Sequence, residues 1–338
     1  MNSKIQIKSM ERIFTENPIN EVWSQLRLFE SEYYCKQILQ EKFNDIDENI
    51  LKKCSLKMST NAKQAFEYYH AASKVSILTS PLLYFYGITC LSNLLLAVNL
   101  KLEDLKTHGL SSKSDENNTL SDEYVLIFKK GAFPALHSCF SDELIKTNSK
   151  FYFEEILSLI PDLKDFYEKI YNKKAWVIRL KNDDYFIYKD VENSVYQAFL
   201  KKSENYFAEN NIIFSNGISN DIICYGNTQY DESRMLNYPI QKNIQGELFF
   251  TLPLEFNNKI YGIPEASAHF ITMFILGMLA RYQPEKWMTI LEGKETSDVN
   301  IINKFIEISK RKFPNLILNA IYQYLRHICC GNNIVFVI

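Results

Sequence analysis

Apolar side chains recur at helical spacing through the first part of the chain. Within residues 20–56 they return every three or four positions, which is the period of one face of an α-helix. A second helix is predicted for residues 61–75, where small and aromatic side chains share one face and Glu67 and His70 lie on the polar face. The N-terminal region is therefore predicted to be helical.

The stretch of residues 75–100 contains no charged side chain. Ser80 and Pro81 form a helix start signal, a hydroxyl at the N-cap followed by proline in the first turn. The helix that follows is apolar almost all round, which is typical of the centre of a bundle. It is also a membrane-span candidate, but Pro81 divides the stretch and polar residues such as Asn93 interrupt it. We therefore expect a buried core helix.

The middle of the chain has a different pattern. Residues 111–122 are polar and lack periodicity, so they are predicted to form a linker or an exposed loop. Beyond them, residues 124–128 and 132–136 flank a turn at Gly131, which is typical of a β-hairpin. A helix is predicted next, for residues 153–171.

A second hairpin is predicted from residues 176–180 and 185–188, which lie on either side of a polar turn. Further short strands are predicted at residues 212–214, 222–225 and 248–254. Strands and helices do not alternate regularly here, which favours an α+β arrangement over a parallel α/β one.

Helical periodicity returns in the last part of the chain. Residues 266–280 are strongly apolar, with His269 as the one ionisable side chain, and predict a second buried helix that carries a core histidine. Residues 298–309 and 313–328 are predicted to form two further helices. Residues 334–338 are predicted to form a β-strand.

Together these patterns predict an α+β protein that is predominantly helical. A helical bundle built on the helices of residues 61–100 and 264–328 would hold a middle region that contains mixed or antiparallel β-structure. The chain is predicted to divide into four regions. They are an N-terminal helical region (residues 1–110), a polar linker or exposed loop (111–122), an α+β region with short hairpins (123–260), and C-terminal helices that join the bundle and end in a short strand (261–338).

Composition places the chain among folded proteins of near-neutral charge. It has 338 residues, 46% of them hydrophobic, and 38 basic against 40 acidic side chains give a net charge of −2. This apolar content excludes disorder for the bulk of the chain, and without a basic excess there is no strong signal for nucleic-acid binding. Seven cysteines without a CxxC pair indicate reduced thiols, and the N-terminus has no apolar leader segment. These features predict a cytoplasmic protein.

Several common chemistries have no motif in this sequence. The phosphate-binding loops GxGxxG and GxxxxGK[ST], the zinc motif HExxH and the nucleophile motif GxSxG are all absent. The five histidines lie far apart along the chain, which disfavours a zinc site. We therefore expect no cofactor and no metal, and a catalytic site would have to be assembled by the fold from distant residues.

Three residues are the candidates for catalysis: His70, His108 and Arg281. Glu67 precedes His70 by three residues on the same helix face and could orient or charge its imidazole, whereas the alternative is an ordinary solvated helix face. His108 is followed by Gly109, which could adopt a positive φ and end the long helix, so a structural role is the alternative there.

Arg281 closes the second buried helix, where the helix dipole favours a cation. Tyr282 and Trp287 follow closely in the sequence, and their rings could stack on the guanidinium. The candidate binding residues are therefore Glu67, His108, Gly109, Arg281, Tyr282 and Trp287.

Short motifs in a characteristic order connect the chain to a known family. They are Trp23, Glu32-Tyr33-Tyr34, Ser80-Pro81-Leu82-Leu83-Tyr84-Phe85-Tyr86-Gly87, His108-Gly109-Leu110, Met278-Leu279-Ala280-Arg281-Tyr282 with Pro284 and Trp287, and Lys312-Phe313-Pro314. In this order and spacing the chain resembles the YaaC-like family of bacterial proteins over most of its length. The resemblance implies a cytoplasmic bacterial protein and supplies no catalytic residues.

The helix that begins with Ser80-Pro81-Leu82-Leu83 also resembles helical HEPN-type modules, many of which are ribonucleases in toxin or antiphage systems. Those enzymes place an arginine four to six residues before a histidine on one helix face. No histidine in this sequence has an arginine at that distance, and Arg326 and His327 are adjacent. The resemblance therefore covers the helical packing and not the catalytic pair.

Two functions follow as hypotheses. The first is a non-catalytic interaction or scaffold protein, which would act as a homodimer or with a protein partner in a bacterial cytoplasmic complex such as a defence system, without a membrane. The second is an RNA- or nucleotide-acting hydrolase of HEPN-like type. Its acid/base groups would be His70 and His108, and Arg281 would bind phosphate.

Overall fold

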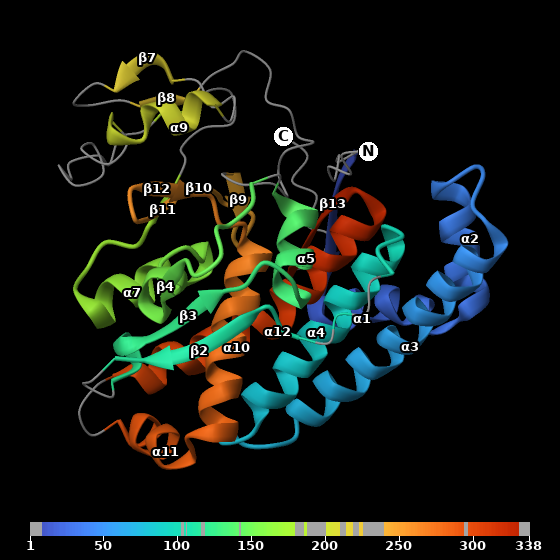
Figure 1. Cartoon of the computed structure of the whole chain (residues 1–338), viewed down its shortest axis with the longest axis horizontal. Helices are drawn as coiled ribbons and strands as arrows, with labels where there is room; N and C mark the ends of the chain where they lie inside the picture. Colours follow the sequence, from blue (N-terminus) through green and yellow to red (C-terminus); the bar gives the residue numbers. More distant parts are fainter. Residues whose placement is uncertain are drawn as a thin grey trace.

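Four long helices, two from each end of the chain, form the centre of the protein. They are α3 (Glu48–Ala72), α4 (Ser80–Val98), α10 (Glu265–Tyr282) and α12 (Asp298–Tyr322). Small sheets lie beside this bundle (Figure 1), which confirms the predominantly helical α+β class. The computed structural model describes residues 9–102, 105, 107–115, 119–141, 143–179, 186–187, 201–209, 214–218, 223–225, 240–293 and 297–330.

Helix α4 packs against the other three helices of the bundle. It is long and apolar enough to cross a membrane by length and composition, yet 72% of the apolar window is buried inside the protein. This burial is what the sequence predicted for a core helix. Cys90 on this helix is buried as a free thiol, and so are the other described cysteines whose side chains are placed: Cys35, Cys54 and Cys139.

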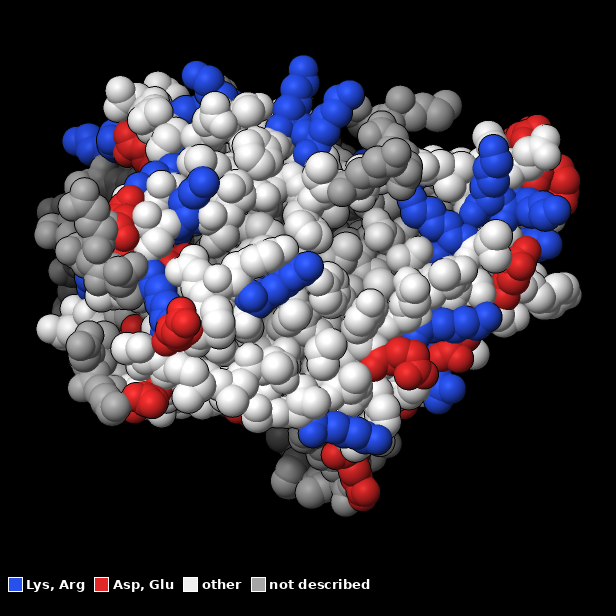
Figure 2. Space-filling view, turned by 60° about the horizontal axis from the view of Figure 1, so that its bottom comes forward, with Lys and Arg blue, Asp and Glu red and all other residues white. Residues whose placement is uncertain are grey.

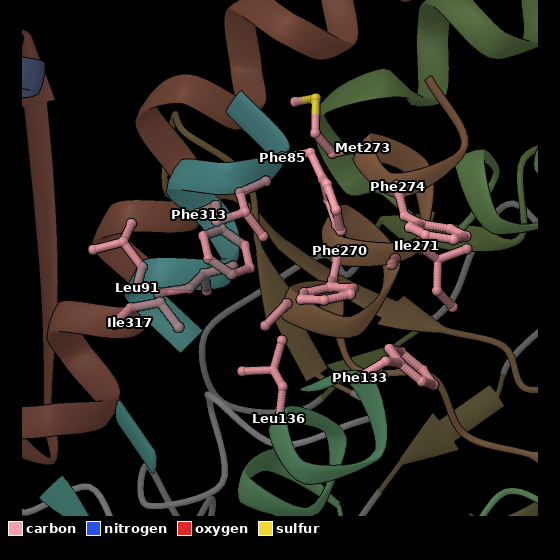
Figure 3. Packing of buried hydrophobic residues seen from close by; sticks show 14 of the residues in the cluster. Phe85, Leu91, Phe133, Leu136, Phe270, Ile271, Met273, Phe274, Phe313 and Ile317 are labelled. Atoms are coloured by element: carbon pink, nitrogen blue, oxygen red, sulfur yellow. The ribbon is translucent and has the colours of Figure 1, made fainter. Parts of the chain in front are cut away.

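Aromatic rings fill the space between α4 and α10. The ring centroid of Phe85 lies 5.6 Å from that of Phe270 and 5.4 Å from that of Phe274, both in edge-to-face arrangements. Figure 3 shows these rings together with Phe313 from α12 and Phe133 from a shorter helix. All five side chains are buried, so the predicted bundle core is assembled from both ends of the chain.

Helix α3 is continuous, although a new helix was predicted to begin at residue 61. Its N-terminus lies at Asp47, whose Oδ1 accepts hydrogen bonds from the backbone amides of Asn49 and Ile50 at 2.9 and 3.1 Å. Asn61 lies in mid-helix, where its side-chain amide donates to the carbonyl oxygen of Lys57 at 2.8 Å. The capping capacity of Asn61 is therefore used inside the helix, and no break occurs.

The predicted helical region before α3 is helical but divided. It consists of α1 (Pro18–Leu26), the 3-10 helix η1 (Arg27–Glu30) and α2 (Glu32–Lys42). Asn17 caps α1, and the hydroxyl of Ser31 accepts a hydrogen bond from the first turn of α2. These caps divide a stretch whose apolar spacing is nearly continuous.

Strand β3 (Glu123–Ile127) lies between β2 (Leu110–Ser114) and β4 (Lys150–Tyr152) in an antiparallel sheet. The prediction of a linker or loop for residues 111–122 is therefore wrong for its first part. Residues 111–114 belong to β2, which pairs with β3 over its whole length. Polar side chains suit this edge strand, most of which is only partly buried.

The hairpin predicted around Gly131 is wrong. The residues after this glycine form helix α5 (Ala132–Phe140) instead of a strand. Phe133 and Leu136 lie one turn apart on the helix and are fully buried, and the Phe133 ring lies 5.9 Å from that of Phe270. Packing against the bundle thus selects a helix where the local apolar run is compatible with either structure.

The predicted helix of residues 153–171 is interrupted at Pro161. It consists of α6 (Phe153–Leu157), the 3-10 helix η3 (Pro161–Leu163) and α7 (Lys164–Tyr171). Proline has no amide hydrogen for a helical bond and restricts the residue before it, which accounts for the break.

Three further sheets have the strand orders β5-β10-β9, β11-β12 and β6-β8-β7. Their strands are β5 (Val177–Arg179), β6 (Phe186–Ile187), β7 (Phe214–Ile218), β8 (Ile223–Tyr225), β9 (Ile240–Lys242), β10 (Leu248–Thr251), β11 (Leu254–Phe256) and β12 (Lys259–Tyr261). The second predicted hairpin is wrong, because β5 pairs with β10 and β6 with β8. The strands predicted at residues 222–225 and 248–254 correspond to β8 and β10, and residues 212–213 lie outside the described part of the chain.

The last two predicted helices are a single helix, α12, which runs through Pro314. Proline removes one helical hydrogen bond. The side chains of Phe313 and Ile317 on either side of it are fully buried in the core. This packing maintains the helix across Pro314, where the sequence pattern predicts a helix boundary.

The chain forms a strand where the end of the last helix was predicted. β13 (Tyr324–Cys330) follows α12 directly and pairs in parallel with β1 (Ser9–Thr15), so the first and the last described strands lie side by side (Figure 1). The strand predicted at residues 334–338 lies outside the described residues. The division of the chain into four regions stays a prediction.

Candidate functional site

The fold brings His108 and Arg281 to the same part of the surface, beside α4 and α10. The His108 ring lies 5.0 Å from Phe85 and 5.7 Å from Phe274, measured between ring centroids. Burial lowers the pKa of His108, and the positive charge of Arg281 lowers it further. These two sequence candidates therefore interact electrostatically, although 173 positions separate them in the sequence (281 − 108).

Arg281 is held by two tyrosines. Its Nη1 donates a hydrogen bond to the hydroxyl oxygen of Tyr86 at 2.8 Å, and its guanidinium carbon lies 4.8 Å from the ring centroid of Tyr282. The predicted stacking of Tyr282 on Arg281 is present. Tyr68 from α3 extends the group, because its ring lies 5.4 Å from that of Tyr86.

Trp287 does not stack on Arg281, contrary to the expectation from the sequence. It lies in α11 (Pro284–Glu292), where it is almost fully buried. Its indole Nε1 donates a hydrogen bond to the carbonyl oxygen of Leu78, in the turn between α3 and α4, at 3.2 Å. Burial thus directs this indole inward, where it joins α11 to the α3–α4 turn.

Four large apolar side chains are exposed where these elements meet. Val75 and Leu78 belong to the α3–α4 turn, Tyr282 is the last residue of α10, Met288 lies in α11, and each is at least 40% exposed. Figure 1 shows both turns at the same end of the bundle, and Figure 2 shows that end as a broad area with few charged side chains at its centre. We call these four residues and Arg281 the bundle-end surface.

Gly109 has the positive φ that the sequence predicts, +74°, but it does not end the long helix. α4 ends at Val98, and Gly109 instead precedes β2. A Cβ atom at Gly109 would lie 2.4 Å from Cδ of Pro134 and 3.2 Å from Cα of Gly131. The glycine is therefore required for close packing of the His108 segment on the start of α5.

His70 lies apart from the His108 region, at an exposed position on α3. Its ring stacks on Phe66, with 5.8 Å between centroids and an angle of 15°. Within the described residues no ion pair joins His70 to Glu67. The charge of Glu67 instead contributes, after the larger effect of Glu30, to raising the pKa of Arg27. The predicted role of Glu67 in orienting His70 is thus not what the contacts show.

A buried charged network that the sequence analysis missed lies between α10, α12 and η3. The Nζ atom of Lys312 lies 3.2 Å from Oδ2 of Asp162 and 3.3 Å from Oε1 of Glu265. It also donates a hydrogen bond to the backbone carbonyl of Lys242. Burial alone would raise the pKa of Glu265, but the Lys312 charge and the nearby His269 lower it overall. One lysine thus compensates two buried carboxylates.

His269 belongs to the same network. Its Nδ1 lies 3.0 Å from the hydroxyl of Ser309, its ring stacks on Phe305, and its Nε2 lies 3.7 Å from Oε1 of Glu265. The predicted core histidine is confirmed as fully buried, but Nε2 has no hydrogen-bond partner among the described residues. The spacing of Glu265 and His269 was a usable signal, since two ionisable residues one turn apart are unusual in an apolar helix.

A cavity of about 650 Å³ lies between α6, α7 and β11. Trp176, Tyr152 and Tyr167 line it together with Glu154 and Glu155. Burial raises the pKa of Glu155. Lys173 and Tyr167 both donate to Glu154, at 2.7 and 3.1 Å, so that carboxylate is already satisfied within the protein. In the described part of the chain, no group of three or more His, Cys, Asp or Glu residues could hold a metal ion.

These features define a class of protein: a predominantly helical α+β fold around an uncharged core helix, with an exposed apolar end. A family model for YaaC-like proteins matches residues 27–321, and the chain belongs to this family. No curated protein and no solved structure matches the chain with significance. The resemblance to HEPN-type modules stays a prediction.

Proposed function

We propose that this YaaC-like protein is a non-catalytic interaction or scaffold protein of a bacterial cytoplasmic complex. One such role is that of a subunit in a defence system. The observation that supports the proposal is the bundle-end surface. Its apolar side chains are exposed: Val75 and Leu78 in the α3–α4 turn, Tyr282 at the end of α10 and Met288 in α11. Exposed apolar side chains next to an arginine and tyrosines are typical of the sites that contribute most of the binding energy in protein interfaces.

The bundle-end surface would bind a protein surface, either a second copy of this chain or another subunit. Its contact energy would come from Met288 on α11 and from Leu78, which lies in the uncharged turn sequence Val75 to Leu78. Arg281 is fixed by its 2.8 Å hydrogen bond to Tyr86 and so would lose little side-chain entropy on binding. This argument makes the surface testable by substitution without disturbance of the core.

The double substitution Leu78→Asp with Met288→Asp is expected to abolish assembly and leave the fold intact. Two buried charges in an apolar contact should weaken association by about 30-fold or more. Light scattering coupled to size exclusion measures this, for the protein alone and co-expressed with the products of neighbouring genes. Leu144→Asp is the matched control, because Leu144 is 78% exposed and outside the bundle-end surface.

The proposal predicts assembly of the wild type and of Leu144→Asp but not of the double variant. A wild-type protein that is monomeric under all conditions and captures none of these products would contradict it. So would a double variant that assembles as well as the wild type.

An RNA- or nucleotide-acting hydrolase is a second candidate, supported by the pair His108 and Arg281. A histidine whose pKa is lowered is neutral at pH 7 and can accept a proton, and an adjacent arginine can bind a phosphate. His70 is remote from this pair, so it is expected to be dispensable for any such activity. RNA cleavage, or toxicity of the expressed wild type, that survives His108→Ala and Arg281→Ala would exclude this candidate.

Substitution of Arg281 by glutamine is expected to raise the pKa of His108. Burial would still hold this pKa below its ordinary value of 6.5, but the repulsion from the guanidinium would be lost. Titration of the His108 ring signals by NMR measures the change, and Lys304→Gln, a change of charge on a different helix, is the control. An unchanged His108 titration in Arg281→Gln would show that the two side chains do not interact.

A further inference from the structure

A cavity of about 240 Å³ lies between α1, α3, α4 and α12, on the His70 side of α3. Its floor consists of Trp23, Tyr69 and Tyr84, which are buried by the surrounding helices. The ring of Tyr69 lies 4.9 Å from that of Trp23 and 5.3 Å from that of Tyr84. Three rings from three helices therefore line the floor, and neighbouring ring planes are inclined by 60° and 73°.

The position of Phe66, at the wall of the cavity, is fixed by contacts on several sides. Its ring lies 5.8 Å from Trp23 in an edge-on arrangement, His70 stacks on it, and the guanidinium of Arg27 lies 4.4 Å from its centroid. Arg27 is in turn held by a 2.8 Å hydrogen bond to Glu30. The wall is therefore rigid before any ligand binds, which reduces the entropy that binding would cost.

The rim of the cavity is polar and carries a positive charge. It consists of Asn20, His70, Ser73 and Lys310. No ion pair or hydrogen bond joins the side chain of Lys310 to another described residue, whereas Lys304 and Lys312 on the same helix pair with carboxylates. A cation without a partner at the mouth of an aromatic cavity favours an anionic group at that position.

The floor also contains an unsatisfied polar group. The hydroxyl of Tyr69 is buried and has no hydrogen-bond partner among the described residues. Burial raises the pKa of Tyr69, so the group stays a neutral hydroxyl.

We propose that this cavity binds a small planar aromatic acid, with its ring against Trp23, Tyr69 and Tyr84 and its carboxylate at Lys310. The volume of about 240 Å³ lies below the range for drug-sized ligands, about 300–1,000 Å³, and so accommodates one ring or a fused pair of rings. The aromatic floor supplies dispersion and ring contacts, and Lys310 supplies the charge that distinguishes an acid from a neutral ring.

This inference does not depend on the proposed function. No residue of the bundle-end surface lines the cavity, so ligand binding and assembly can be lost separately. The double variant Leu78→Asp with Met288→Asp is therefore expected to bind the acid as well as the wild type does. Loss of assembly with intact binding, or the reverse, distinguishes failure of one proposal from failure of the other.

The test uses the full chain with isotope-labelled tryptophan, because the three tryptophans each give one indole signal. The signal of Trp23 is identified by its absence from Trp23→Phe. Benzoate and indole-3-carboxylate are expected to shift the Trp23 signal and to leave those of Trp176 and Trp287 in place. Benzylamine, which has the opposite charge, and benzyl alcohol, which has none, are expected to bind more weakly than benzoate.

Lys310→Met removes the charge at the rim and is expected to weaken benzoate binding by about tenfold or more, with little effect on benzyl alcohol. Lys304→Met, on the same helix, is the matched control and should bind as the wild type does. The proposal is overturned if neither acid shifts the Trp23 signal, if benzylamine binds as tightly as benzoate, or if Lys310→Met binds benzoate unchanged.

Discussion

Replacement of Lys312 by methionine is expected to lower the free energy of unfolding by about 3–5 kcal/mol, because it leaves buried carboxylates without a counter-charge. Lys312 lies 3.2 Å from Asp162 and 3.3 Å from Glu265, and all three side chains are almost fully buried. Methionine has a similar length, so the loss would come from charge and hydrogen bonding rather than from a cavity. Urea denaturation at pH 7 measures the difference.

The loss in Lys312→Met is also expected to depend on pH. In the wild type the pKa of Glu265 is lowered, so its stabilising contribution is present above its unfolded pKa and is lost as the pH falls through the folded one. Without Lys312, burial would raise this pKa instead, and the ionised carboxylate would destabilise the folded state at neutral pH. The difference from the wild type should therefore shrink as the pH falls towards 4.

Lys304→Met is the matched control for this prediction. Lys304 lies on the same helix, and its ion pair with Glu307 is at the surface, where such pairs contribute about 0–1 kcal/mol. Its unfolding free energy should stay close to that of the wild type. If Lys312→Met is as stable as Lys304→Met at pH 7, the buried network does not contribute as the geometry indicates.

The parts of the fold that follow from composition alone could be predicted from the sequence. α4 and α10 are expected as buried helices because their long apolar stretches have no polar face to turn towards water. The resemblance to the YaaC-like family was recognised from short motifs and is confirmed over residues 27–321. These predictions do not depend on knowing which helices and strands pack against one another.

Elements whose structure depends on their neighbours were predicted poorly. The run after Gly131 is apolar enough for a strand or a helix, and its packing on Phe270 selects the helix. Pro314 indicates a helix boundary locally, but burial on both sides overrides it. The partner of β5 is β10, about 70 residues later, a pairing that no local signal specifies.

The candidate sites show the same division. The residue types of His108, Arg281 and His70 make them candidates in the sequence, but the sequence does not show which of them lie together. In the structure His108 and Arg281 converge, whereas His70 lines a separate cavity. The network around Lys312 was missed because its members come from α10, α12 and η3, and periodicity does not show which faces meet. Chemistry that depends on convergence therefore needs the tertiary structure.

Gly131→Ala is expected to destabilise the fold by about 4 kcal/mol or more, a loss that few single substitutions reach. The φ of Gly131 is +134°, and a Cβ atom would lie 2.3 Å from the backbone nitrogen and 2.5 Å from Cα of Gly109. Both contacts are with backbone, so no side-chain rotation can relieve them. The hydrogen bonds from Ala132 to the Thr107 carbonyl and from Phe133 to the His108 carbonyl, both 2.9 Å, would be strained as well.

Gly293→Ala separates the two causes of this loss, because Gly293 has a positive φ of +63° at the exposed end of α11. Backbone strain alone costs about 1–2 kcal/mol, and this variant should lose no more than that. Thermal unfolding of both variants measures the stabilities, and the NMR signals of His108 report whether its segment has moved from α5. Equal losses in the two variants would show that the close contact of Gly109 with Gly131 contributes nothing. A displaced His108 in Gly131→Ala would connect this contact to the geometry of the His108–Arg281 pair.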